Sequence, residues 1–143
     1  MIKQIFLSSC ILLFTATGSF GQCDVDFSNP AAVGDFILNA IKESNVPAFE
    51  CTFNKVNRSK SGNVKGFMQE CIKFTEGVNK ITELRRYERR KGVVWVICKL
   101  KAIDHEMMVI TLSLENGKYL FEDINSPDVS QYEQLPIIDI KQE

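Results

Sequence analysis

The first half of the chain places apolar residues with the period of an α-helix. Asn29 suits an N-cap, and Pro30 suits the first helical position, where no amide donor is needed. The first apolar stripe runs every three or four positions through Val33, Phe36, Ile37, Ala40 and Ile41. A second stripe predicts another helix over residues 63–76, with Gly77 as its stop. Its apolar face consists of Val64, Phe67, Met68, Cys71, Ile72 and Thr75.

The segment between the two helices is polar and irregular. Asn45 and Pro47 are expected to end the first helix. Alternation of apolar and polar residues over 49–54 predicts a short edge strand. Asn57-Arg58-Ser59 is an N-glycosylation sequon in a predicted loop, and it matters only in a eukaryotic source.

From residue 80 onward the apolar period changes to two, which predicts β-strands. Four strands are expected, over residues 81–89, 93–102, 107–115 and 118–124. Short turns separate them, and Asn116-Gly117 is typical of a type I′ hairpin turn. Turns this short require antiparallel neighbours. The sequence therefore predicts an α+β fold, with two N-terminal helices packed on a bent four-stranded antiparallel meander. The tail offers a last extended piece at Ile137-Ile138.

The lengths of the turns predict which residues lie opposite each other across the sheet. The expected pairs are Leu112 with Phe121, Leu114 with Tyr119, Leu114 with Trp95, Leu112 with Ile97, and Trp95 with Tyr87. They gather a bulky row on the face expected to pack against the helices: Tyr87, Trp95, Ile97, Ile110, Leu112, Leu114, Tyr119 and Phe121. The other face is too apolar for ordinary solvation, which predicts cover by the tail or a homodimer. Its apolar members include Val94, Val96, Cys98 and Leu100.

The N-terminal residues have the pattern of a secretory signal peptide. Lys3 precedes a short apolar run, and Ser19 and Gly21 fit a small-x-small cleavage site. The run is too short for a transmembrane helix. We expect a signal peptide over 1–21 and a single domain over 22–143, with its core at about 28–126. The product would be secreted or periplasmic, and lipid attachment at Cys23 is the less favoured alternative.

Export also changes how the cysteines are interpreted. Of five cysteines, Cys10 leaves with the signal peptide, and four remain. An even number in a small exported domain favours disulfides, and four cysteines allow three pairings. A bond between Cys51 and Cys71 is our candidate, and buried free thiols are the alternative. The spacings match no zinc template, so no metal site is predicted.

Charge excludes some partners. Of the 143 residues, 17 are basic and 18 acidic, for a net charge of −1, which disfavours nucleic-acid binding. His105 is the only histidine and lies in a predicted hairpin turn, which weakens histidine-based catalysis. Six basic and two acidic residues between Lys80 and Lys91 give this segment a charge of +4. The basic run either protects a strand edge from aggregation or contacts an anionic partner.

The order of elements resembles a known superfamily. The helix over 29–44, the strand over 93–102 and the hairpin over 112–124 resemble the nuclear-transport-factor-2-like superfamily, a cystatin-like cone, and especially its small exported bacterial members of unknown function. Enzymes of that superfamily place an acidic residue or histidine inside the cone as a general acid or base. The resemblance therefore implies Asp123 or Glu83 as a candidate base. Fold features alone do not establish an activity.

Candidate ligand-binding residues lie on the predicted bulky face. Tyr87, Trp95 and Tyr119 form a possible stacking platform, although such a row is more often core. Lys99 lies opposite Glu83 and is either a binding cation or half of an ordinary cross-strand pair. No cofactor is predicted. We expect a non-catalytic module that binds a small molecule or a protein; the alternative is a lyase or isomerase with a pocket carboxylate as its base.

Overall fold

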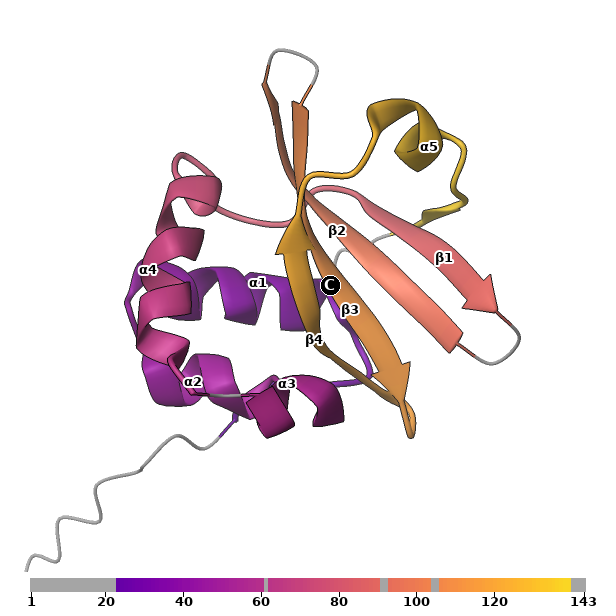
Figure 1. Ribbon diagram of the computed structural model, residues 1–143. Helices are drawn as coiled ribbons and strands as arrows, with labels where there is room; N and C mark the ends of the chain where they lie inside the picture. The colour runs from indigo at the N-terminus through magenta and orange to yellow at the C-terminus, as the bar shows by residue number, and fades with distance from the viewer. Residues whose placement is uncertain (1–22, 61, 91–92, 104–105, 140–143) are drawn as a thin grey trace, which may run out of the picture.

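The structure, a computed structural model, describes residues 23–60, 62–90, 93–103 and 106–139 and has an α+β fold (Figure 1). The predicted signal peptide and His105 lie outside these residues. The helices are α1 (Pro30–Lys42), α2 (Val46–Cys51), α3 (Lys55–Lys60), α4 (Val64–Thr75) and α5 (Val129–Glu133). The strands are β1 (Leu84–Arg90), β2 (Val93–Ile103), β3 (Glu106–Glu115), β4 (Lys118–Asn125) and β5 (Ile137–Ile138). In the part of the chain described, no helix has the length and apolar character to cross a membrane.

The two long N-terminal helices begin and end where the sequence predicts. The Asn29 side chain accepts hydrogen bonds from the amides of residues 31 and 32 and caps α1. Asn63 caps α4 by accepting from the amide of Gly66, at 3.0 Å. Gly77 follows α4 with a φ of 77°, a conformation that suits glycine after a helix.

The predicted edge strand over 49–54 is wrong, because the first half of this segment belongs to α2. Asn45 caps α2 through the amide of Ala48, and Pro47 lies in its first turn, so these residues begin a helix as well as follow one. Extended pairing is limited to Phe53, which forms a single parallel bridge with Phe121 on β4. This bridge fastens the α2–α3 connection to the edge of the sheet.

The sheet has five strands in the order β4-β3-β2-β1-β5, all antiparallel to their neighbours. Asn116 and Gly117 both have positive φ, which confirms the predicted turn between β3 and β4. The prediction of four strands is incomplete, because the extended piece in the tail joins the sheet. Ile138 and Ile137 of β5 pair with Leu84 and Arg85 of β1.

The register of β2 against β3 differs from the prediction by one residue. Near their turn, Ile103 pairs with Glu106, as the predicted two-residue loop requires. Further along, Leu100 has no cross-strand partner, and this β-bulge shifts the pairing. Beyond the bulge, Val96 and not Ile97 lies opposite Leu112. A shift of one residue exchanges the two faces of a strand.

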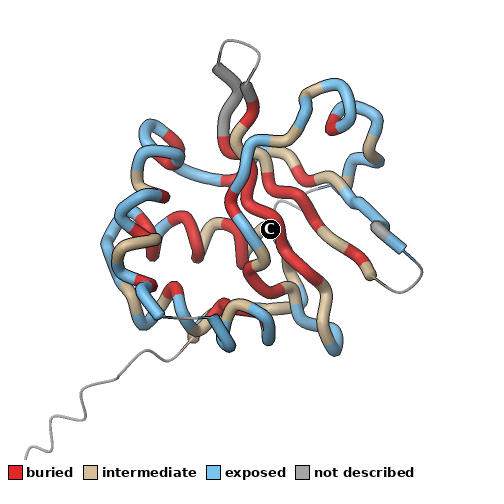
Figure 2. The backbone as a smooth tube through the Cα atoms, in the orientation of Figure 1, coloured by how far each residue is buried: buried red, intermediate tan, exposed pale blue. Residues whose placement is uncertain are grey.

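The predicted bulky face is therefore wrong for β1 and β2 and right for the middle of β3 and β4. The face that packs against α1 and α4 carries buried residues from four strands, and Figure 2 shows that burial is most extensive along the central strands β2 and β3. These are Leu84, Val96, Cys98, Leu100, Ile110, Leu112, Phe121 and Ile124. Tyr87 and Trp95 pair with each other on the opposite face, which we call the outer face.

The tail covers part of the outer face. Helix α5 places Tyr132 in a second, smaller core with Ile97, Met107 and Val109, and Val129 and Leu135 pack around it. Tyr132 is 1% exposed although it belongs to a helix of five residues. Cover by the tail is thus confirmed for this region, while the homodimer stays a prediction.

The disulfide joins Cys23 to Cys51, so the predicted bond between Cys51 and Cys71 is wrong. Cys71 belongs to the apolar stripe of α4, which turns it into the core and away from the half-buried Cys51. Burial, together with the charges of Glu70 and Asp123, raises the pKa of the Cys71 thiol to about 12. Burial also raises the pKa of Cys98. A disulfide is compatible with the expected export.

Substitution of Gly34 tests the packing of α1 on the sheet. An added Cβ would lie 2.9 Å from Cγ1 of Ile81 and 3.1 Å from Sγ of Cys98. Gly34→Ala should lower the free energy of unfolding by roughly 1–3 kcal/mol, because overpacking outweighs the gain in helix propensity. Urea denaturation measures the change. Gly62→Ala is the control, since the nearest contact of its Cβ would be the carbonyl oxygen of Lys60, 4.0 Å away. A stabilised Gly34→Ala would contradict the observed face of β2.

Removal of the disulfide should be costly. The bond spans 28 residues of sequence, and closure of a loop this long contributes roughly 3–4 kcal/mol in the chain-entropy description. The double variant Cys23→Ser/Cys51→Ser should lose about this amount in urea denaturation without reductant. Peptide mapping under non-reducing conditions should find residues 23 and 51 in one linked species. A linked species that contains Cys71 would refute the assignment.

Candidate functional site

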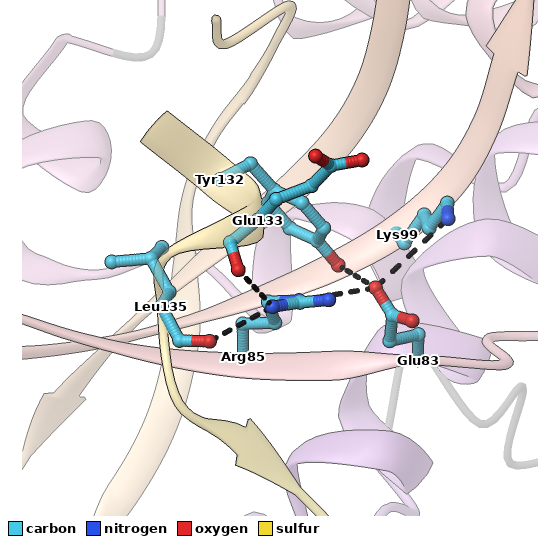
Figure 3. Close-up of polar contacts among 6 residues, drawn as sticks. All are labelled: Glu83, Arg85, Lys99, Tyr132, Glu133 and Leu135. Carbon is cyan, nitrogen blue, oxygen red and sulfur yellow. Dashed lines mark hydrogen bonds and ion pairs between the residues drawn. The ribbon is translucent and has the colours of Figure 1, made fainter. Parts of the chain in front are cut away.

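Glu83 and Lys99, two of the predicted site residues, meet in a polar cluster on the outer face (Figure 3). Oε1 of Glu83 accepts a hydrogen bond from the Tyr132 hydroxyl at 2.7 Å and from Nε of Arg85 at 3.2 Å. Nζ of Lys99 lies 3.9 Å from the same oxygen. The cluster thus joins residues of β1 and β2 to helix α5.

Arg85 completes the attachment of the tail. Its Nη1 donates to the carbonyl oxygens of Glu133 and Leu135, both at 2.9 Å. Its guanidinium carbon lies 4.8 Å from the ring centroid of Tyr132, a cation–π distance. Figure 3 shows these contacts converging on one guanidinium. We call Glu83, Arg85 and Tyr132 the tail latch.

The electrostatics of the tail latch keep Glu83 charged. Burial alone would raise the pKa of Glu83, but hydrogen bonds from Tyr132 and Arg85 and the charge of Lys99 hold it below its ordinary value. Burial and the hydrogen bond to Glu83 raise the pKa of the Tyr132 hydroxyl. A general base that acts near neutral pH needs the opposite shift. This environment supports a structural role for Glu83.

The predicted aromatic platform is divided between the two faces of the sheet. Tyr87 and Trp95 lie together on the outer face, with ring centroids 5.7 Å apart and planes inclined by 53°. Tyr119 packs against the main core on the helix face and does not join them. The two inclined rings therefore present no single flat surface for stacking.

The outer face stays open beyond the tail. Tyr87 is 37% exposed and Ile137 is 61% exposed, while Trp95 is half-buried. Arg90 pairs with Val93, two residues from Trp95, so it lies on the same face. A bulge between Glu88 and Arg90 brings it there. We call Tyr87, Arg90, Trp95 and Ile137 the open patch.

Asp123, the other predicted base, lies far from Glu83 along the sheet, with β2 and β3 between their strands. It lines a separate cleft of about 260 Å³ between β4, α3 and α4. The other lining residues are Phe53, Asn57, Lys60, Asn63, Val64, Phe67, Phe121 and Glu122. Asp123 is exposed, and its carboxylate accepts hydrogen bonds from the amide of Ile124 and the side chain of Asn125. A carboxylate this open to water suits ligand binding better than proton abstraction.

Two asparagines support the strand that carries this carboxylate. Asn57 donates both amide hydrogens, to the carbonyl oxygens of Phe121 at 3.0 Å and Glu122 at 2.7 Å. Asn54, 1% exposed, donates to the hydroxyl of Ser113 and to the carboxylate of Glu122. Since both amide hydrogens of Asn57 are engaged, the sequon is poorly suited to glycosylation. Sequence reasoning missed this role, although asparagines after a helix end are a signal for local capping.

Comparisons with models of protein families, with curated proteins and with solved structures find no match for this chain. Among the described residues, no group of three or more histidine, cysteine, aspartate or glutamate side chains is placed to hold a metal ion. The site must therefore be interpreted from its own geometry.

Tyr132→Phe tests the tail latch. The ring should stay packed while Glu83 loses a hydrogen bond, so the free energy of unfolding should fall by about 1 kcal/mol near neutral pH. Because the pKa of Glu83 is lowered in the folded protein, the charged Glu83 stabilises the fold at pH values above the ordinary glutamate pKa of about 4.3. That stability is lost as the pH falls through the folded-state pKa. The difference between wild type and variant should therefore shrink in acid.

Urea denaturation at a series of pH values between neutral and acid measures this effect. Tyr119→Phe is the matched control, because Tyr119 packs on the other face and belongs to no latch. Its effect should not depend on pH in this range. A Tyr132→Phe loss that is the same at every pH would show that Glu83 does not hold the tail.

Proposed function

We propose that this chain is a non-catalytic binding domain that recognises the acidic surface of another protein through the open patch. The observation that carries the proposal is the exposure of Tyr87 next to Trp95, with the exposed Ile137 on the same face of the sheet, which the tail covers only in part. Tyrosine, tryptophan and arginine are the residues enriched at the energetic centres of protein interfaces. An exposed apolar patch with a charged rim is typical of such surfaces.

Charge favours an acidic partner over a second copy. Among the described side chains of β1, Arg90 is the exposed charge that lies on the outer face, because Arg86 and Glu88 pair with Val96 and Val94 of the helix face. Two copies that met through the open patch would bring two Arg90 side chains to one interface, and like charges held close together are destabilising. An acidic surface would gain attraction and faster association from Arg90.

The inclination of the two rings favours a protein over a flat ligand. The ring planes of Tyr87 and Trp95 are inclined by 53° to one another. Two inclined rings suit the irregular surface of a cluster of protein side chains. The ionised Glu83 supports a non-catalytic function for the outer face, because Tyr132 and Arg85 already occupy its carboxylate with hydrogen bonds.

A displayed peptide library tests the proposal. Peptides selected on the folded wild-type protein should be enriched in Asp and Glu with an apolar residue among them. Binding should change the fluorescence of Trp95, the only tryptophan in the chain. Tyr87→Ser should weaken binding about tenfold or more, as loss of an interface centre does.

Phe74→Ser is the matched control, because Phe74 on α4 has the same 37% exposure as Tyr87. It should leave the affinity unchanged. Selected peptides that bind Tyr87→Ser as well as wild type would refute the open patch. A homodimer that Tyr87→Ser dissociates in sedimentation would assign the patch to a second copy and overturn the acidic partner.

A further inference from the structure

The cleft beside Asp123 is a second candidate site. It lies at β4, at the other end of the sheet from the strands that carry the open patch, and the two sites share no residue. Its floor is aromatic. Phe53 and Phe121 lie beneath, with ring centroids 5.5 Å apart, and Phe67 forms the more accessible wall. The Phe67 centroid lies 6.2 Å from that of Phe121. Ring faces attract cations through their quadrupole.

Two consecutive carboxylates, Glu122 and Asp123, line the same cleft. Neighbouring residues of a regular strand point to opposite faces. A bulge in β4 explains the exception: Phe121 pairs with Leu112 and Asp123 with Thr111, which leaves Glu122 as the extra residue. The bulge thus places two negative charges against one aromatic floor.

The bulge is held in place by buried polar contacts. Asn57 satisfies the carbonyl oxygens of Phe121 and Glu122, and the buried Asn54 bonds the Glu122 carboxylate. These bonds fix the bulge and the Glu122 carboxylate before any ligand arrives, and a site fixed in advance loses less entropy on binding.

The remaining charge in the cleft is Lys60, which is exposed at the end of α3. The described contacts include no ion pair between Lys60 and either carboxylate. The lining therefore carries a net charge of −1, from two carboxylates and one ammonium. At about 260 Å³ the cleft is smaller than the roughly 300–1,000 Å³ of drug-sized sites.

We infer that this cleft binds a small organic cation of the quaternary or alkylated ammonium class. The methyl groups of such a cation pack against the half-buried Phe67, with the buried Phe53 and Phe121 behind it, while its charge faces Glu122 and Asp123. Aromatic surfaces with nearby negative charge are suited to alkylated ammonium groups, because these cations are weakly hydrated and large. A metal ion would find apolar rings where it needs oxygen ligands.

Choline and its neutral isostere 3,3-dimethylbutan-1-ol test the inference, because they share a shape and differ in charge. Titration followed by calorimetry and by amide chemical shifts should show choline binding at least about tenfold more tightly, with shifts near residues 63–67 and 121–123. Equal binding of both compounds, or no binding of choline to the folded wild-type protein, would overturn the inference.

Charge variants locate the site. Glu122→Gln/Asp123→Asn keeps acceptor oxygens for the existing hydrogen bonds but removes both charges, and it should weaken choline binding about tenfold or more. Lys60→Met should strengthen binding roughly two- to fivefold, because it removes a repelling charge. Asp139→Asn, a change at an exposed carboxylate in the tail, is the control and should have no effect.

Phe67→Leu separates the aromatic contribution from simple burial, since leucine retains an apolar wall. Choline affinity should fall about fivefold while that of the neutral isostere changes little. Circular dichroism of every variant checks that it is folded. Unchanged choline affinity in the folded double carboxylate variant would refute the cleft as the site. None of these variants touches the open patch, so either result leaves the proposed function to its own test.

Discussion

The structure depends most on one extra residue in the longest strand. Leu100 interrupts the pairing of β2 with β3, and the shift decides which side chains of β1 and β2 face the helices. With the bulge, Val96 and Cys98 enter the main core, and Gly34 of α1 approaches Cys98. Ile97 is left on the outer face, where Tyr132 covers it. Helix packing and the attachment of the tail thus follow from the same local irregularity.

Local signals in the sequence predict the elements well, because they act over a few residues. Asn29, Asn63 and Gly77 set the ends of α1 and α4, and Asn116-Gly117 sets a hairpin. The bulge leaves no such signal. Lys99-Leu100-Lys101 continues the alternation of polar and apolar residues, so the pattern reads as a regular strand although the pairing is not.

Long-range contacts account for what the sequence could not predict about the candidate sites. The predicted pairing of β1 with β2 correctly places Lys99 opposite Glu83, but Tyr132 reaches Glu83 from a helix 49 residues further along the chain. No residue close to Glu83 in the sequence indicates that Tyr132 is its partner. The contact with Tyr132 makes Glu83 part of the tail latch and not a candidate base. The disulfide is a different case, since the apolar stripe of α4 is a local pattern that already places Cys71 on a buried face, and Cys51 bonds to Cys23 instead.

Both proposed surfaces lie where a strand departs from regular alternation. The bulge after Glu88 brings Arg90 to the side of Tyr87 and Trp95, and the bulge at Glu122 lets that residue share a cleft with Asp123. A regular strand divides consecutive charges between its two faces, which suits a core on one side and water on the other. A bulge instead gathers side chains that are neighbours in sequence onto one surface. In this sheet, the features that obscure the register are therefore the same features that build its candidate binding surfaces.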